Sequence, residues 1–86
     1  MHTENLVIES SLPADPDNQN NDRAYWAKVA LNAFARITGM SSADEDEENI
    51  LSDLLCNLMH LCDRLDIDFS AALLGAKHDY RAETCE

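Results

Sequence analysis

The sequence predicts an all-α protein, a small three-helix bundle with a long central helix and a flexible N-terminal arm. Apolar residues recur three and four positions apart in three separate stretches, which is the spacing of one helix face. Both prolines lie before the first stretch, and Gly39 lies between the first and the second. A chain of 86 residues is one domain and buries only about 60% of its unfolded surface. It leaves little room for a deep pocket between lobes, which argues against an enzyme.

Residues 1–21 are predicted to form the flexible arm, which is acidic and polar. The run 17–21 is entirely polar, and the only apolar anchors are Leu12 and the group Leu6, Val7 and Ile8. Such a composition cannot offset the entropy lost on ordering. Two readings stay open: an extension without a role, or a segment that docks on the core or a partner through Leu6, Val7 and Ile8.

The helical domain is predicted to span residues 22–82. Its first helix starts at Asn21 or Asp22, either of which can cap it, and ends near Thr38, where Gly39 can adopt a left-handed conformation. Two apolar seams run along it, formed by Trp26, Ala30, Ala33 and Ile37 and by Ala27, Leu31 and Phe34. The other surface is basic and carries Arg23, Lys28, Asn32 and Arg36.

The central helix is predicted over residues 43–65. Ser42 and Glu45 have the spacing of a capping box, and acidic residues fill the first turns, where the helix dipole favours negative charge. A heptad-like apolar stripe then follows for four turns. It consists of Leu51, Leu54, Leu55, Leu58, Met59, Cys62 and Leu65, flanked by Ile50 and Leu61.

A third helix is predicted over about residues 69–82. The segment 66–68 ends the second helix, and Asp68 caps the third. Phe69, Leu73, Ala76 and Tyr80 recur at helical spacing, and Gly75 predicts close packing against a neighbouring helix. Residues 83–86 are expected to fray.

Acidic residues dominate the charge of the chain, which is −11. The segment 41–66 holds eight Asp and Glu against one Arg. Such a field repels nucleic acid and anionic membranes and favours basic partner surfaces. The run 44–48 has two readings: a solvated helix start, or charge presented to a basic partner. The predicted partner-binding residues are Asp44, Glu45, Asp46, Glu47, Glu48 and Asp53.

No catalytic, metal or cofactor site is predicted. Glu45 and Glu48, with Asp63 and Asp66, have the spacing of the magnesium ligands of all-helical nucleotide pyrophosphohydrolases, but Asp63 lies over about 20 Å from Glu48 along one helix. Only a head-to-tail homodimer could bring them together. Cys56, His60 and Asp63 share one flank of that helix, but Cys62 projects away and no fourth ligand is apparent.

The three cysteines predict a reducing compartment. Cys56, Cys62 and Cys85 are odd in number, and two of them would be about 9 Å apart on one helix, too far for a disulfide. No signal segment is recognised, and the apolar runs fall short of the roughly 18 residues that a membrane span needs. The expected location is the cytoplasm of a bacterial host.

The segment 49–64, followed by Asp68-Phe69 and by the run 78–80, resembles a pattern in short phage and mobile-element proteins, some of which are anti-CRISPR proteins. The resemblance spans about residues 24–83 and consists of a similar apolar stripe with the same helical spacing. It implies a protein that binds a type I CRISPR surveillance complex and blocks target DNA binding. The N-terminal arm has no counterpart in that pattern.

The sequence therefore predicts a non-enzymatic inhibitory binding protein whose partner is a protein or ribonucleoprotein with a basic nucleic-acid site. Carboxylates at the start of the central helix would stand in for phosphates, as a DNA mimic does. No direct nucleic-acid or membrane binding is expected. The alternative is a homodimeric helical assembly or antitoxin-like module in which the stripe of Leu51, Leu58 and Leu65 pairs with another copy.

Overall fold

The computed structural model describes residues 12–40 and 46–85, and this part of the chain forms three helices. They are α1 (Asn20–Ile37), α2 (Glu47–Leu65) and α3 (Phe69–Thr84). No strand occurs among the described residues, so the prediction of an all-α fold is confirmed. The longest helix is α2, and it packs against both α1 and α3, as predicted for the central helix.

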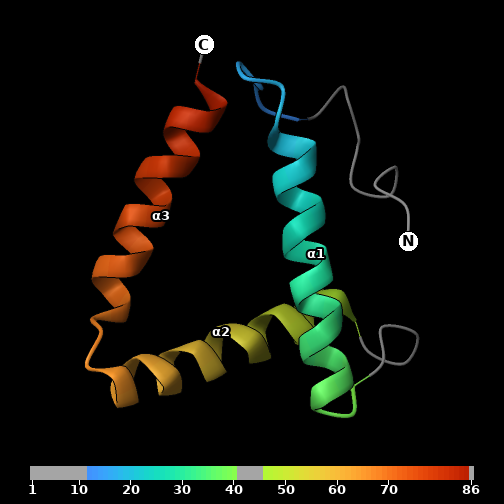
Figure 1. Ribbon diagram of the computed structural model, residues 1–86, viewed down its shortest axis with the longest axis vertical. Coiled ribbons are helices and arrows are strands. Elements are labelled where there is room, and N and C mark those ends of the chain that lie inside the picture. The colour runs from blue at the N-terminus through green and yellow to red at the C-terminus, as the bar shows by residue number, and fades with distance from the viewer. Residues whose placement is uncertain (1–11, 41–45, 86) are drawn as a thin grey trace.

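The three helices form an open triangular frame (Figure 1). The lower part of α1 crosses the start of α2, while α3 turns back from the other end of α2 and runs up the opposite side of the opening, approaching the start of α1 at the top. The molecule measures 37 × 33 × 16 Å. Its radius of gyration of 14.6 Å exceeds the about 12 Å of a compact chain of this length.

Residues before α1 supply its cap. The helix begins at Asn20, two residues before the predicted domain start, and the side chain of Gln19 makes no capping hydrogen bond. Instead the carboxylate of Asp15 accepts hydrogen bonds from the backbone N–H groups of Gln19 and Asn20, at 3.1 and 3.2 Å. The described end of the predicted arm is thus folded onto the start of α1.

At the other end of α1, the predicted stop at Gly39 is confirmed. Gly39 has φ +78° and its N–H donates to the carbonyl of Arg36, while Thr38 N–H donates to Phe34. Only glycine adopts such a left-handed conformation without a steric cost from Cβ.

The predicted start of α2 is wrong by four residues. The helix begins at Glu47, and its cap is Asp46, whose side chain accepts a hydrogen bond from the N–H of Glu48 at 3.1 Å. Asp46 caps a helix that starts at Glu47, whereas Ser42 was expected to cap one that starts at residue 43. The Ser42–Glu45 capping box lies outside the described residues. At about 1.5 Å per residue, α2 is about 28 Å long.

The turn between α2 and α3 follows the prediction. Asp66 takes a left-handed conformation with φ +59°, and Ile67 N–H donates to the carbonyl of Cys62 at 2.9 Å. Asp68 then caps α3 by accepting from the N–H of Ala71 at 3.2 Å. These contacts end one helix and start the next within three residues. α3 continues to Thr84, two residues beyond the predicted end.

Very little of the described chain is buried. Ala35 on α1 and Ile50 on α2 are the buried apolar residues, where the two helices cross. An ion pair between Lys28 and Glu47 joins the same helices. The predicted seam of α1 is not packed, since Trp26 is 61% and Ile37 83% exposed. The interpretation of Gly75 is also wrong, because a Cβ there would meet nothing within 4 Å.

The two glycines should respond in opposite ways to alanine. Gly75→Ala places a better helix former in open space on α3 and should stabilise the protein by about 0.5–1 kcal/mol. Gly39→Ala forces φ +78° on an L-residue and should destabilise it by about 1 kcal/mol. Urea unfolding followed by circular dichroism measures both. A loss of stability in Gly75→Ala would mean that α3 is closely packed at that point.

Candidate functional site

The largest candidate surface is the apolar half of α2. Successive residues of a helix are rotated by about 100°, which puts all its large apolar side chains within one half of the circumference. We call this set the apolar face of α2: Ile50, Leu51, Leu54, Leu55, Leu58, Met59, Leu61, Cys62 and Leu65. The other half is polar and carries Asn49, Ser52, Asp53, Cys56, Asn57, His60, Asp63 and Arg64.

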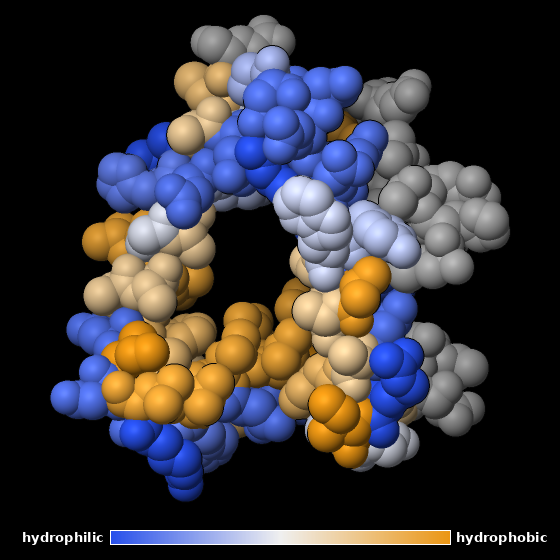
Figure 2. Space-filling model, in the orientation of Figure 1, coloured by the Kyte–Doolittle hydropathy of each residue, from blue (hydrophilic) through white to orange (hydrophobic). Residues whose placement is uncertain are grey.

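Most of the apolar face is accessible to water. Six of its nine residues are exposed, from 37% at Leu58 to 57% at Leu65, while Leu54 and Cys62 are half-buried and Ile50 is buried. Figure 2 shows apolar side chains of α2 along the border of an opening through the frame. An apolar face of this width is normally covered by neighbouring helices, and here α1 and α3 reach only its two ends.

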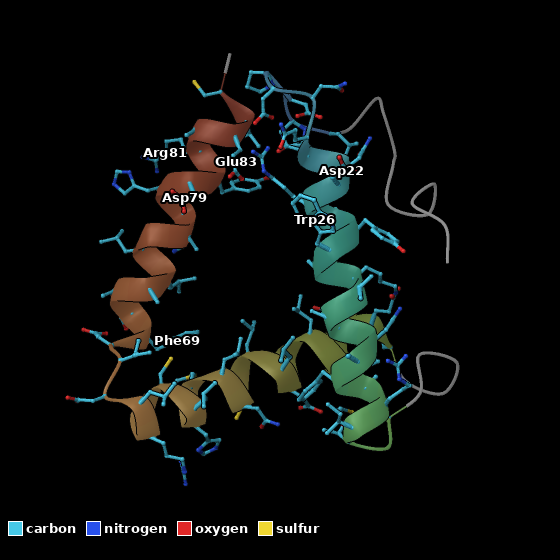
Figure 3. The ribbon with its side chains drawn as sticks, in the orientation of Figure 1. Asp22, Trp26, Phe69, Asp79, Arg81 and Glu83 are labelled. Carbon is cyan, nitrogen blue, oxygen red and sulfur yellow. The ribbon has the colours of Figure 1, made fainter. Side chains whose placement is uncertain are left out.

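Apolar side chains of the other helices extend this surface. Phe69 lies at the corner where α3 leaves α2, and Trp26 lies on the stretch of α1 that borders the opening (Figure 3). Leu73 and Tyr80 share the helix face of Phe69 and are 42% and 60% exposed. We call the apolar face of α2 together with Trp26, Phe69, Leu73 and Tyr80 the inner surface of the frame.

A depression of about 490 Å³ lies in the corner between α1 and α2. Its lining includes Ala27 and Leu31 of α1 and Leu51 and Leu54 of α2. The paired residues Lys28 and Glu47 also contribute to its wall. The small alanines leave this space open, so a side chain from another polypeptide could enter it.

The predicted acidic site is only partly assembled by the fold. Asp44 and Glu45 lie outside the described residues. Asp46 caps α2 and Glu47 pairs with Lys28, so both carboxylates have roles within the chain. Glu48 is exposed in the first turn, whereas Asp53 is exposed on the polar half of α2. Residues 46–48 therefore lie together, and Asp53 faces a different side.

The other predicted chemistry concerns metals and cysteines. Among the described residues, no group of three or more His, Cys, Asp and Glu is placed to hold a metal ion. Cys56, Cys62 and Cys85 are free thiols.

A polar cluster that the sequence reasoning missed closes the open end of the frame. Arg23 on α1 makes a two-pronged ion pair with Asp17, at 2.9 and 2.7 Å, and lies 3.4 Å from the carboxylate of Glu83 on α3. Asn20 donates to the backbone carbonyl of Glu83 at 2.7 Å. The contact joins residues 63 positions apart in sequence, and no local pattern announces it. We call these residues the apex.

Hydrogen bonding at the apex shifts two pKa values. The hydrogen bonds from Arg23 lower the pKa of Asp17 below its ordinary 3.8, and the same contact raises the pKa of Arg23. Because the folded state holds Asp17 ionised, this pair stabilises the fold fully above pH 3.8, and the contribution is lost as the pH falls through the lowered pKa.

Asp17→Asn should therefore remove part of the acid dependence of stability. At neutral pH the urea midpoint of the variant should be lower than that of the unmodified protein, because the variant lacks the ion pair. The two midpoints should converge as the pH falls below 3.8. Asp79→Asn, a change at an exposed carboxylate of α3, is the matched control and should leave the profile unchanged. Parallel profiles for the unmodified protein and Asp17→Asn would show that the ion pair does not form in solution.

Comparison with protein families, with curated proteins and with solved structures finds no match to this chain. Within the described residues, no helix combines the length and apolar character needed to cross a membrane. The surfaces described above are therefore the basis on which a function is assigned.

Proposed function

We propose that this protein is a non-enzymatic binding module that acts by associating with another polypeptide through the inner surface of the frame. The observation that carries the proposal is the exposure of six of the nine residues in the apolar face of α2, from 37% at Leu58 to 57% at Leu65. Folded monomers rarely expose contiguous apolar patches larger than a few hundred Å², and larger ones mark interaction sites.

The energetic reason is the transfer of this surface out of water. Each Å² of apolar surface that a partner covers contributes about 25 cal/mol to association. Leu51, Leu55 and Leu58 lie on one side of a single helix, so one partner surface can cover all three together.

A narrower proposal concerns the identity of the partner. The resemblance to anti-CRISPR proteins, together with the acidic start of α2, supports a type I CRISPR surveillance complex as the target. Of the predicted contact residues that the structure describes, Glu48 and Asp53 are exposed and use their carboxylates neither in the cap of α2 nor in the pair with Lys28. Asp46 and Glu47 are engaged within the chain. A basic partner would have to displace the N–H of Glu48 from Asp46, or Lys28 from Glu47, and this would weaken its contact with them.

A paired substitution on α2 tests the role of the inner surface. Leu58→Asp puts a charge into the centre of the apolar face, and His60→Asp puts the same charge on the polar half two residues away. Retention of a partner on the tagged protein should fall by about a hundredfold or more in Leu58→Asp, because a buried unpaired charge costs several kcal/mol. It should be unchanged in His60→Asp. Equal retention by both variants would contradict the proposal.

The narrower proposal has its own test. Glu48→Gln combined with Asp53→Asn should weaken binding to a purified type I surveillance complex, and the loss should match the effect of added salt on the unmodified protein. Leu74→Ala, on an exposed part of α3 outside the inner surface, is the control. Binding that neither the carboxylate changes nor salt alter would rule out charge mimicry.

A further inference from the structure

We propose that the polypeptide covering the inner surface is a second copy of this chain, in a two-fold dimer whose α2 helices run antiparallel with Leu58 close to the axis. This inference rests on the proposed function, because it names the occupant of the same surface. Its three supports are the small core of the single chain, the near symmetry of the apolar face and the distribution of charge.

The first support is that one chain buries almost no core. Stable domains pack layers of secondary structure around a core, and here Ala35 and Ile50 are the buried apolar residues among those described. A second copy packed on the inner surface supplies the missing apolar contacts.

The surface area leads to the same conclusion. The chain exposes 6752 Å², whereas a compact protein of 9.6 kDa exposes about 5,100 Å². A dimer that reached the area typical of its doubled mass would remove about 5,000 Å² from water in total. That area is at the upper end of the about 2,000–5,000 Å² found in obligate homodimers.

The second support is the order of residues in the apolar face, seven of whose nine residues read alike in both directions. About Leu58, Leu51 is the counterpart of Leu65, Leu54 that of Cys62, and Leu55 that of Leu61. A two-fold interface requires a patch that is complementary to itself. An antiparallel pair centred on Leu58 largely meets this requirement, since these seven residues then face apolar residues of the other copy, and only Ile50 and Met59 at the margins of the face have polar counterparts, Asp66 and Asn57. It also sets the two helix dipoles in opposite directions.

The third support is the position of the charges. Beyond its first turn, the apolar half of α2 carries no charged residue, and Asp53, Asp63 and Arg64 all lie on the polar half. A basic partner would gain no charge complementarity on this surface, whereas a second copy needs none. Within the chain itself, Leu6, Val7 and Ile8 are the longest apolar run outside the described residues, and they are too few to cover the apolar face.

Disulfide trapping tests the symmetry directly. In a chain with Cys56→Ser, Cys62→Ala and Cys85→Ser, Leu58→Cys should form a covalent dimer under mild oxidation, because residues on the axis come within disulfide reach. Asp53→Cys, on the polar half, should not. A mixture of Leu51→Cys and Leu65→Cys chains should give more covalent dimer than either alone, because each meets the other across the axis.

Sedimentation of the full chain gives the second readout. We expect a dimer with a dissociation constant of about 1 μM or lower, weakened about a hundredfold or more by Leu58→Asp and unchanged by His60→Asp. Added salt should strengthen the dimer, because it screens the repulsion between two chains of charge −11.

Two results would overturn the inference. One is a monomer at every concentration, and the other is trapping through Asp53→Cys but not through Leu58→Cys. If the chain is monomeric and still binds a different polypeptide in a manner sensitive to Leu58→Asp, the second copy is excluded while the proposed function stands. If neither its own copy nor any other polypeptide depends on Leu58, both fail.

Discussion

The structure depends on one constraint, which is that α2 carries more apolar surface than α1 and α3 can cover. Its apolar face extends around half of the helix, whereas each neighbour touches one end of it. Only Ile50 is buried there, by α1. The hydrophobic effect is the main force that offsets the conformational entropy of the chain, so a frame with this little buried surface needs further burial.

Local signals hold the frame open. Asp66 in its left-handed conformation and the cap at Asp68 turn the chain sharply between α2 and α3, and the apex then ties the end of α3 to the start of α1. The helices meet at their corners and leave the middle of the inner surface uncovered (Figure 2). The polar contacts thus fix the shape, and the apolar surface that this shape exposes gives the basis for binding.

Sequence reasoning predicted what depends on neighbouring residues. The three helices, the stop at Gly39 and the turn at 66–68 follow from spacing and capping, and the structure has them. The start of α2 was misplaced because Asp46 and Ser42 both suit a cap, and the sequence alone does not rank them. The packed side of α1 and the apex depend on how helices meet across long sequence separations. Periodicity shows which residues are apolar and leaves open what covers them.

Periodicity in the sequence shows how wide the apolar face of α2 is. It could not show that this face is exposed, which is the feature on which the proposed function rests. A stripe of ordinary width would have been covered by one neighbour, while a face from Ile50 round to Met59 calls for more than one. The acidic start of α2 contributes capping at Asp46 and an ion pair at Glu47, which leaves less charge for a partner than the run of acids suggests.

The most direct measurement of the central claim is urea unfolding of the purified chain at low and at high protein concentration. If the apolar face of α2 is covered by a second copy, folding and association are linked, and the midpoint rises with concentration. A midpoint that is independent of concentration, with a cooperative transition, would show that the single chain is stable alone and would contradict the account.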